Sequence, residues 1–117
     1  MLVGCGKAES ESARVEHSIN GFVAAYNDED FDKCTDYLTG VTDDATKLTA
    51  MANVQSVRQL GGEIEVNSID SMSIQGKVAT ANWTITTNGV TATSAIALYK
   101  VDGKWKFVLG ELLGIEG

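Results

Sequence analysis

The first half of the chain repeats apolar residues with the period of an α-helix. Four of them recur at steps of four, three and four, which places them on one face. They are Val15, Ile19, Phe22 and Tyr26. The run Asn27-Asp28-Glu29-Asp30 ends this helix and supplies the N-cap and first-turn charge of a second one. The pattern therefore predicts two helices in close succession.

The second helix is expected to end at Gly40, and a third follows it. The buried side of the second helix is expected to hold Phe31, Cys34 and Leu38. Thr42 is the predicted N-cap of the third helix, and Gly61-Gly62 its end. Its expected core residues are Leu48, Met51 and Val54.

After residue 62 the pattern changes to the period of two that is typical of strands. Asn88-Gly89 and Asp102-Gly103 are strong hairpin turns, and counting outward from them gives the register. The first turn pairs Ile85 with Ala92, Trp83 with Ser94, Ala81 with Ile96 and Ala79 with Leu98. The second pairs Leu98 with Phe107, Ile96 with Leu109 and Lys100 with Trp105. Both turns predict the same core face, so a three-stranded meander follows, joined by an earlier strand from about Glu63 to Ile74.

Three helices followed by a sheet with one apolar face predict an α+β fold in which the helices cover that face. The chain has 117 residues, the size of one domain, and 44% of them are hydrophobic, as in globular proteins. We expect a tether over residues 1–10 and a single domain over residues 11–117. The opposite face of the sheet is rich in threonine and should be wetter.

Charge and cysteine content exclude several classes of function. The formal net charge is −7, and no basic run in the sequence offsets it, which argues against nucleic-acid binding. The chain has no Cys-x-x-Cys motif and one histidine, His17, which points away from the predicted core. We therefore expect neither a metal nor a cofactor.

The segment Leu2-Val3-Gly4-Cys5 matches the lipobox of bacterial lipoproteins, in which small residues precede a lipidated cysteine. Small polar residues follow it, as a tether requires. The motif predicts lipidation of Cys5 and an extracytoplasmic, membrane-anchored protein. A chance match in an ordinary N-terminus is the alternative. Cys34 is expected to be a buried thiol, with a Cys5–Cys34 disulfide as the rival interpretation.

One acidic residue could serve as a catalytic base. If the strand before residue 75 ran unbroken, Asp70 would face the core and its pKa would rise, with Tyr26 as a hydrogen-bond donor nearby. A bulge near Asn67-Ser68 would instead turn Ile69 inward and leave Asp70 in water. We favour the bulge, so Asp70 and Tyr26 stay a low-priority catalytic pair.

Three segments resemble the nuclear transport factor 2-like superfamily, which includes ketosteroid-isomerase-like and SnoaL-like proteins. They are residues 22–31, 77–81 and 98–107. Within that superfamily the chain is most similar to small secreted bacterial lipoproteins of unassigned function. The resemblance implies a cone-shaped roll with a pocket between helices and sheet, often in a dimer, and it implies no particular activity.

These observations favour a binding or protein-interaction domain without catalytic activity. Its expected pocket residues are Tyr26, Met51, Trp83, Leu98 and Phe107. They suit a small apolar ligand or a peptide. An isomerase-like or cyclase-like enzyme is the alternative. A structural homodimer, paired through the threonine-rich face with Val78, Tyr99 and Val108, is a third class.

Lipidation gives a direct test of the N-terminal motif. Mass spectrometry of protein from its native membrane should find Cys5 as the first residue, carrying added lipid mass. An intact Met1 on that native protein would contradict the expectation.

Overall fold

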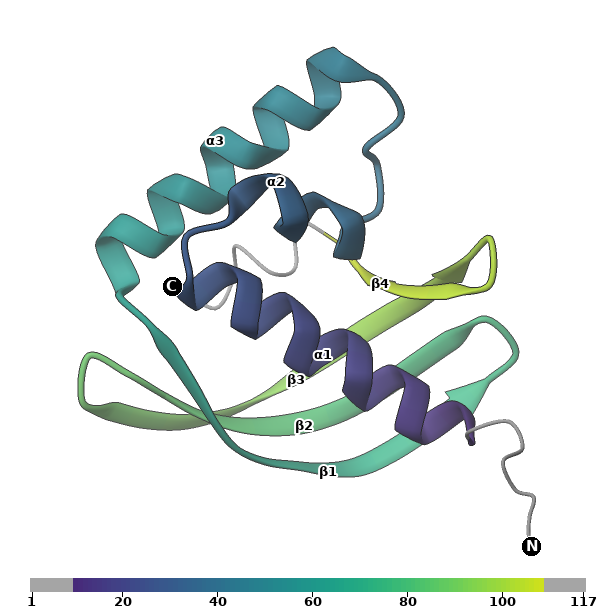
Figure 1. Cartoon of the computed structure of the whole chain (residues 1–117). Coiled ribbons are helices and arrows are strands. Elements are labelled where there is room, and N and C mark those ends of the chain that lie inside the picture. Colours follow the sequence, from purple (N-terminus) through teal and green to yellow (C-terminus); the bar gives the residue numbers. More distant parts are fainter. Residues whose placement is uncertain (1–9, 109–117) are drawn as a thin grey trace, which may run out of the picture.

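Three helices cover one face of a four-stranded antiparallel sheet in the computed structural model, which describes residues 10–108 (Figure 1). The helices are α1 (Glu11–Asn27), α2 (Phe31–Cys34) and α3 (Asp44–Gly61), with a 3-10 turn, η1 (Thr35–Tyr37), after α2. The strands are β1 (Ile64–Gln75), β2 (Val78–Thr87), β3 (Val90–Val101) and β4 (Lys104–Phe107), and their order in the sheet is β1-β2-β3-β4. The predicted α+β class is confirmed.

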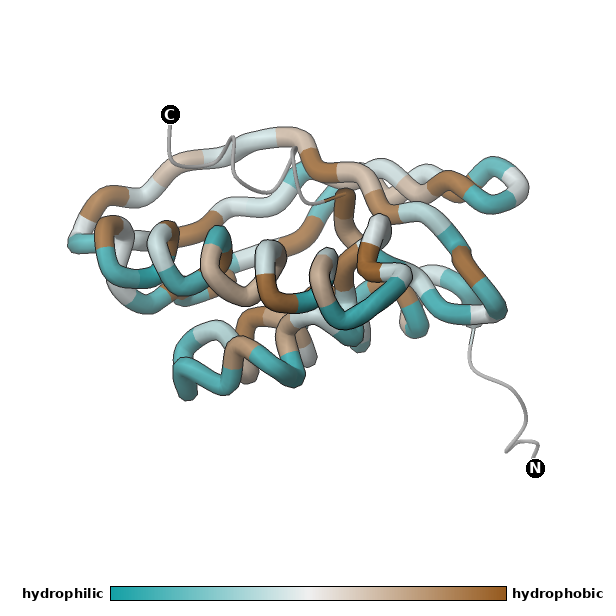
Figure 2. Tube along the Cα trace, turned by 90° about the horizontal axis from the view of Figure 1, so that it is seen from above, coloured by the Kyte–Doolittle hydropathy of each residue, from teal (hydrophilic) through white to brown (hydrophobic). Residues whose placement is uncertain are grey.

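The first helix buries the predicted face. Val15, Ile19, Phe22 and Tyr26 are all at most 2% exposed. Figure 2 shows hydrophobic and hydrophilic residues alternating along both the helices and the strands, as expected for two layers that share one core.

The second helix is shorter than predicted. Its α-helical part ends at Cys34, because the Thr35 hydroxyl donates to the Asp32 carbonyl at 2.6 Å and the chain tightens into η1. Leu38 is buried, as expected, but it lies in extended backbone and forms a parallel bridge with Phe107. The predicted helix end at Gly40 is therefore wrong.

The third helix begins one residue later than predicted, at an Asp43–Thr46 capping box. It ends as predicted at Gly61, where Gly62 takes a positive φ of 73°. Its core residues are Ala50, Val54 and Val57, whereas Leu48 is 66% exposed and Met51 is half-buried. Only Val54 of the predicted core set is fully buried.

The sheet has the predicted register. All six predicted pairs within the described residues are present, and the pair Ile96–Leu109 lies outside them. Trp83 is fully buried, and its indole N–H donates to the Ser94 hydroxyl at 3.2 Å. The Phe107 ring lies 5.2 Å from Phe22 and 6.1 Å from Trp83, centroid to centroid. Ala92 and Ser94 pair as predicted but are exposed, so the packed layer ends before them.

The first strand contains two register shifts. One lies between Val66 and Ser68, so that Ile69 pairs with Trp83 on the core face. The other lies between Asp70 and Ser73 and includes Ser71 at a positive φ of 57°. Between the two shifts Asp70 is exposed, which confirms the predicted bulge.

Asn27 and Arg58 join α1, α3 and β1 at one end of the molecule. The Asn27 amide donates to the Ile64 carbonyl and accepts from the Ile64 N–H, both at 2.8 Å. The Arg58 guanidinium donates to the Tyr26 and Asn27 carbonyls at 3.1 and 3.2 Å. The last carbonyls of α1 are thereby satisfied without water.

Glu11 joins α1 to the β3–β4 hairpin at the other end. Its carboxylate accepts from the Trp105 indole N–H at 2.9 Å, from the Lys100 ammonium at 3.1 Å and from Arg14 at 3.5 Å. The Trp105 and Lys100 hydrogen bonds hold the pKa of Glu11 below its ordinary value of 4.5.

Truncating the central aromatic residue tests the packing. Trp83→Ala should lower the free energy of unfolding by roughly 3–5 kcal/mol, because it removes a large, fully buried side chain. Thr84→Ala, the adjacent residue on the outer face, should cost about 1 kcal/mol or less. Chemical denaturation measures both, and similar losses for the two variants would contradict the register.

Glu11 should make stability depend on pH. Because its pKa is lower in the folded chain, its stabilising contribution is present above about pH 4.5 and is lost as the pH falls through the folded value. Glu11→Gln should be less stable than the wild type at pH 7, and the two should converge in acid. Melting temperatures across this range test the effect, with Glu16→Gln as the control. Parallel curves for wild type and Glu11→Gln would refute it.

Candidate functional site

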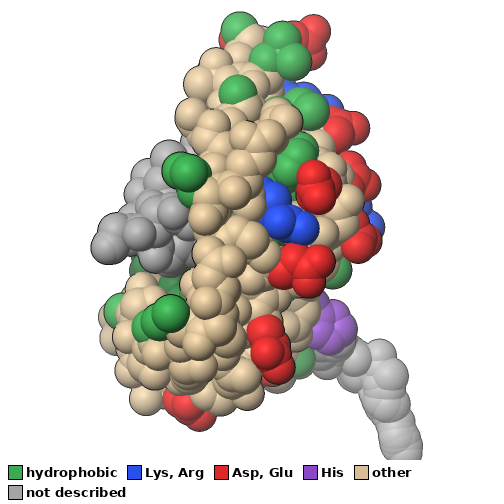
Figure 3. All heavy atoms as spheres, turned by 90° about the vertical axis from the view of Figure 1, so that its left-hand side faces the viewer, with side chains coloured by type: hydrophobic (Ala, Val, Ile, Leu, Met, Phe, Trp, Pro, Cys, Tyr) green, Lys and Arg blue, Asp and Glu red, His purple; other side chains and the backbone are tan. Residues whose placement is uncertain are grey.

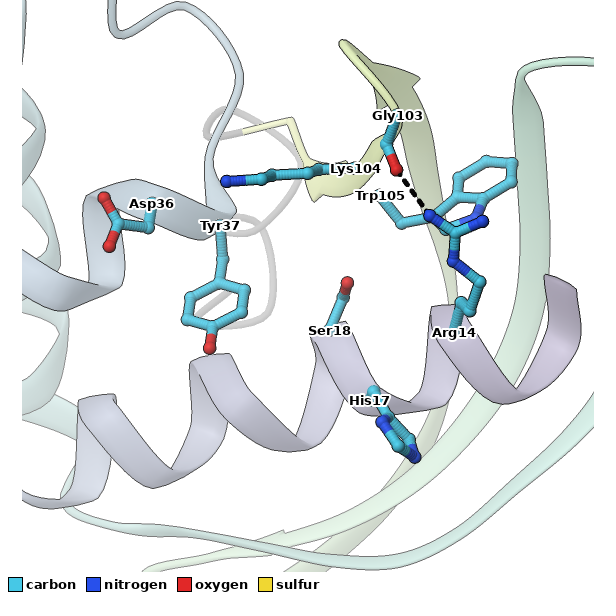
Figure 4. A pocket seen from close by; sticks show the side chains of 8 residues that line it. All are labelled: Arg14, His17, Ser18, Asp36, Tyr37, Gly103, Lys104 and Trp105. Carbon is cyan, nitrogen blue, oxygen red and sulfur yellow. Dashed lines mark hydrogen bonds between the residues drawn. The ribbon is translucent and has the colours of Figure 1, made fainter. Parts of the chain in front are cut away.

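A cavity of about 300 Å³ opens between α1, η1 and the β3–β4 hairpin (Figure 4). Its lining comes from three separate parts of the chain. Arg14, His17 and Ser18 lie on α1, Asp36 and Tyr37 on η1, and Gly103, Lys104 and Trp105 on the hairpin. The shortened second helix positions this wall, because η1 carries Tyr37 over α1.

Tyr37 packs directly on the backbone of α1. A Cβ built on Gly21 would lie 2.5 Å from the Tyr37 hydroxyl oxygen and 2.8 Å from the ring carbon that bears it. The absence of a side chain at this position therefore allows the ring to approach the helix. Any larger residue would displace the aromatic wall of the cavity.

Arg14 is held in place at the hairpin side of the cavity. Its guanidinium donates to the Gly103 carbonyl at 2.8 Å, which Figure 4 marks. Lys104 is exposed, and its side chain extends across the opening in the direction of η1 (Figure 4). Two cationic groups therefore border the cavity, against one acidic residue, Asp36.

The Trp105 indole is fixed from two sides. It is 2% exposed, its N–H is used by Glu11, and the Lys100 ammonium lies 5.8 Å from its ring centroid. Because the Trp105 side chain is buried, the aromatic surface of the cavity comes from Tyr37, which is partly exposed. Cations, aromatic rings and the Ser18 hydroxyl are groups that bind a planar anion.

The residues predicted to line a pocket lie elsewhere. Tyr26, Trp83, Leu98 and Phe107 are buried in the core, and Met51 is half-buried on α3. None of them lines the three cavities described in this section. The pocket predicted around these five residues stays a prediction.

The low-priority catalytic pair is not brought together. Asp70 is exposed on the outer face of β1, where the Ser68 hydroxyl donates to its carboxylate at 3.2 Å. Tyr26 is 2% exposed in the core at the end of α1. His17 is exposed, as predicted, although it also lines the cavity.

Cys34 is a free, fully buried thiol. Burial, and to a smaller extent the charge of Asp30, raises the pKa of this thiol to about 12. Such a thiol stays protonated and is a poor nucleophile at neutral pH. Cys5, with the rest of the proposed lipobox, lies outside the described residues.

Two further cavities carry less chemical information. One, of about 270 Å³, lies between residues 39–41 and α3 and is lined by small and uncharged side chains. The other, of about 360 Å³, lies at the β1–β2 hairpin and is lined by Ser73, Gln75, Val78 and Thr80. Residues 10–108 contain no cluster of metal-ligating side chains, and no helix among them could span a membrane.

Neither the models of known protein families nor the curated protein sequences include a match to this chain. Solved structures do match. A protein of unknown function from Mycobacterium tuberculosis has a TM-score of 0.65 at 14% identity, covering 83% of this chain and 71% of its own. A nuclear transport factor 2-like protein of unknown function from Shewanella oneidensis has a TM-score of 0.54 at 17% identity, with coverages of 84% and 94%.

A further nuclear transport factor 2-like protein of unknown function, from Cytophaga hutchinsonii, covers 86% of this chain and 88% of its own, with a TM-score of 0.51 and 14% identity. Identities this low establish the fold and leave the activity open. The chain has the nuclear transport factor 2-like fold, as the sequence resemblance predicted.

Proposed function

We propose that this chain is an extracytoplasmic, lipid-anchored domain that binds a small ligand between α1, η1 and β4 and catalyses no reaction. The observation that carries the proposal is the cavity of about 300 Å³ with its mixed cationic and aromatic lining. This volume is at the lower end of the range for small-molecule sites, which combine apolar surface with a few polar groups.

The lining favours a ligand with a carboxylate group and a planar apolar body. The chain as a whole carries a net charge of −7, yet Arg14 and Lys104 border this cavity. Asp36 is the one acidic residue of the lining, and Glu11 lies 3.5 Å from Arg14. The partly exposed ring of Tyr37 offers surface for the planar part. The C-terminal carboxylate of a peptide has the same charge, so the peptide ligand predicted from the sequence is compatible with this site.

The position of Asp70 supports binding over catalysis. An isomerase of this fold needs a carboxylate base within hydrogen-bond reach of a substrate proton, in a pocket that excludes water. Asp70, the candidate from the sequence, is exposed on the outer face of the sheet and is not part of the cavity lining. The enzyme alternative therefore has no base at the position that the sequence suggested.

The lipid anchor rests on the lipobox and on the length of the chain that follows it. Only residues 6–9 separate Cys5 from Ser10, whose side chain caps α1. A short polar spacer before the first helix is what a tethered domain requires. Extracytoplasmic location follows from the same motif and is part of this proposal.

A homodimer through the outer sheet face stays a prediction. On that face the Thr84 and Thr93 hydroxyls are 2.8 Å apart, as are those of Thr86 and Thr91. Val78, at the start of β2, is 37% exposed. Paired hydroxyls make this surface polar, but their hydrogen bonds are already satisfied within one chain.

Paired fragments test the ligand class. Aromatic carboxylates such as benzoate should raise the melting temperature of the chain, whereas the matching amides such as benzamide should not, because only the former have a charge for Arg14 and Lys104. Lys104→Gln should weaken carboxylate binding about 2- to 5-fold, the usual effect of one exposed ion pair. Titration calorimetry measures this change.

Two further variants control that experiment. Lys77→Gln removes an exposed lysine that is not part of the cavity lining and should leave binding unchanged. Ser18→Phe, which fills the cavity from α1, should abolish binding, while Ser56→Phe on the exposed surface of α3 should not. Equal responses to carboxylates and amides, or full binding by Ser18→Phe, would reject this site.

A further inference from the structure

The charges of this protein are strongly separated along its length. Between Asp28 and Asp70 the chain has ten acidic residues and three basic ones. The remaining described residues carry five basic side chains against three acidic ones, Glu11, Glu16 and Asp102. The five are Arg14, Lys77, Lys100, Lys104 and Lys106. Although the formal net charge of the chain is −7, basic residues outnumber acidic ones in this region.

The fold brings this region to one end of the molecule. The start of α1, the β1–β2 turn and the β3–β4 turn lie at the same end in Figure 1. Arg14 on α1 donates to Gly103 in the β3–β4 turn, and the Lys100 N–H donates to the carbonyl of Lys77 in the β1–β2 turn at 2.9 Å. We call these five basic residues the basic end. Figure 3, which views the molecule from the opposite side, shows Asp and Glu side chains along one flank, with Lys and Arg side chains among them.

The side chains of the basic end are available to solvent. Lys77 and Lys104 are exposed, and Lys106 is partly exposed. Lys100 and Arg14 are partly neutralised by Glu11, at 3.1 and 3.5 Å. The exposed Glu16 and Asp102 offset part of the charge of the three other lysines, so the excess of the whole region is two positive charges, five basic against three acidic residues.

The tether enters the domain at the same end. Ser10 is the N-cap of α1, so the chain between Cys5 and Ser10 reaches at most about 18 Å even when fully extended. A lipid on Cys5 would hold the start of α1 within that distance of the headgroups. Fields from lysines at the domain surface extend over a Debye length of about 8 Å, less than half of this maximum reach, so they act when the tether is less than fully extended.

We infer that the basic end docks on the anionic headgroups of the membrane to which Cys5 is tethered, with the acidic part of the domain directed away from it. The inference rests on the lipid anchor of the proposed function. An untethered chain with this net charge is repelled by an anionic surface at long range, so the anchor has to bring the basic end within reach. Docking then orients the domain and places the cavity between α1, η1 and β4 near the headgroups.

A synthetic anchor tests the orientation independently of native lipidation. The full chain is coupled through Cys5 to a maleimide lipid in vesicles of pure phosphatidylcholine or with about one third phosphatidylglycerol. Cys34 is buried and its thiol pKa is raised to about 12, so it should not compete for the maleimide. Lysine acetylation by a water-soluble reagent, followed by mass spectrometry, then reports the accessibility of each lysine.

Lys77, Lys104 and Lys106 should be acetylated at least about threefold more slowly on the anionic vesicles. Lys33 and Lys47, on α2 and α3, are internal controls and should react equally on both vesicle types. Raising the salt to about 1 M, where the Debye length is about 3 Å, should remove the protection. Lys77→Glu should weaken the protection of Lys104 and Lys106, whereas Lys33→Glu should not.

Equal acetylation on both vesicle types, or stronger protection of Lys33 and Lys47, would overturn the inference even if native Cys5 is lipidated. Protection on the synthetic anchor combined with an unlipidated native Cys5 would support the orienting surface and reject the native anchor. The two proposals therefore fail in distinguishable ways.

Discussion

The side chain of Asn27 hydrogen-bonds to the backbone of β1 as a neighbouring strand would, at the point where the helical layer meets the sheet. Its amide donates to and accepts from the backbone of Ile64, both at 2.8 Å, so β1 begins at a fixed position beneath the end of α1. Arg58, with a side chain only 14% exposed, binds the last carbonyls of α1 and lies 3.5 Å from Glu29 and 3.7 Å from Glu63. Loss of the Asn27 side chain would leave the N–H and C=O of the buried Ile64 without these partners, and loss of Arg58 would remove the donor to the Asn27 carbonyl. Each buried group left unpaired costs about 1–3 kcal/mol. This junction therefore joins the end of α1 to the start of β1 and to α3.

The parts of the fold that could be predicted are those controlled by local chemistry. Asn88-Gly89 and Asp102-Gly103 each allow one tight turn, and the alternation between them leaves one register in which Trp83 and Phe107 share a face. The extended backbone of Leu38 and the exposure of Leu48 escaped prediction, because helical spacing does not identify the partner of an apolar residue. Leu38 is buried by pairing with β4, and Leu48 lies on α3 away from the core.

The candidate site was harder to predict than the fold. Its lining comes from α1, η1 and the β3–β4 hairpin, and only the fold brings Arg14, Tyr37 and Lys104 together. Tyr37 lies in a segment that the sequence pattern extends as α-helix, so its position over Gly21 had no signal in the periodicity. The position of Trp105 did have a signal in the sequence, because the hairpin register places it opposite Lys100 on the inner face. The exposure of Asp70 was predicted correctly, since Ser68 and Asp70 together interrupt the alternation of apolar residues along the strand.

The two bulges of β1 have a consequence for the behaviour of many copies together. Within residues 10–108, β1 pairs with β2 alone and forms an edge of the sheet. A long regular edge strand offers its backbone to the edge of another molecule and so promotes polymerisation. Here the ladder is interrupted after Val66 and again after Asp70, where Ser71 adopts a left-handed backbone. A neighbouring strand would find no continuous row of partners, which matters most for proteins crowded on a surface.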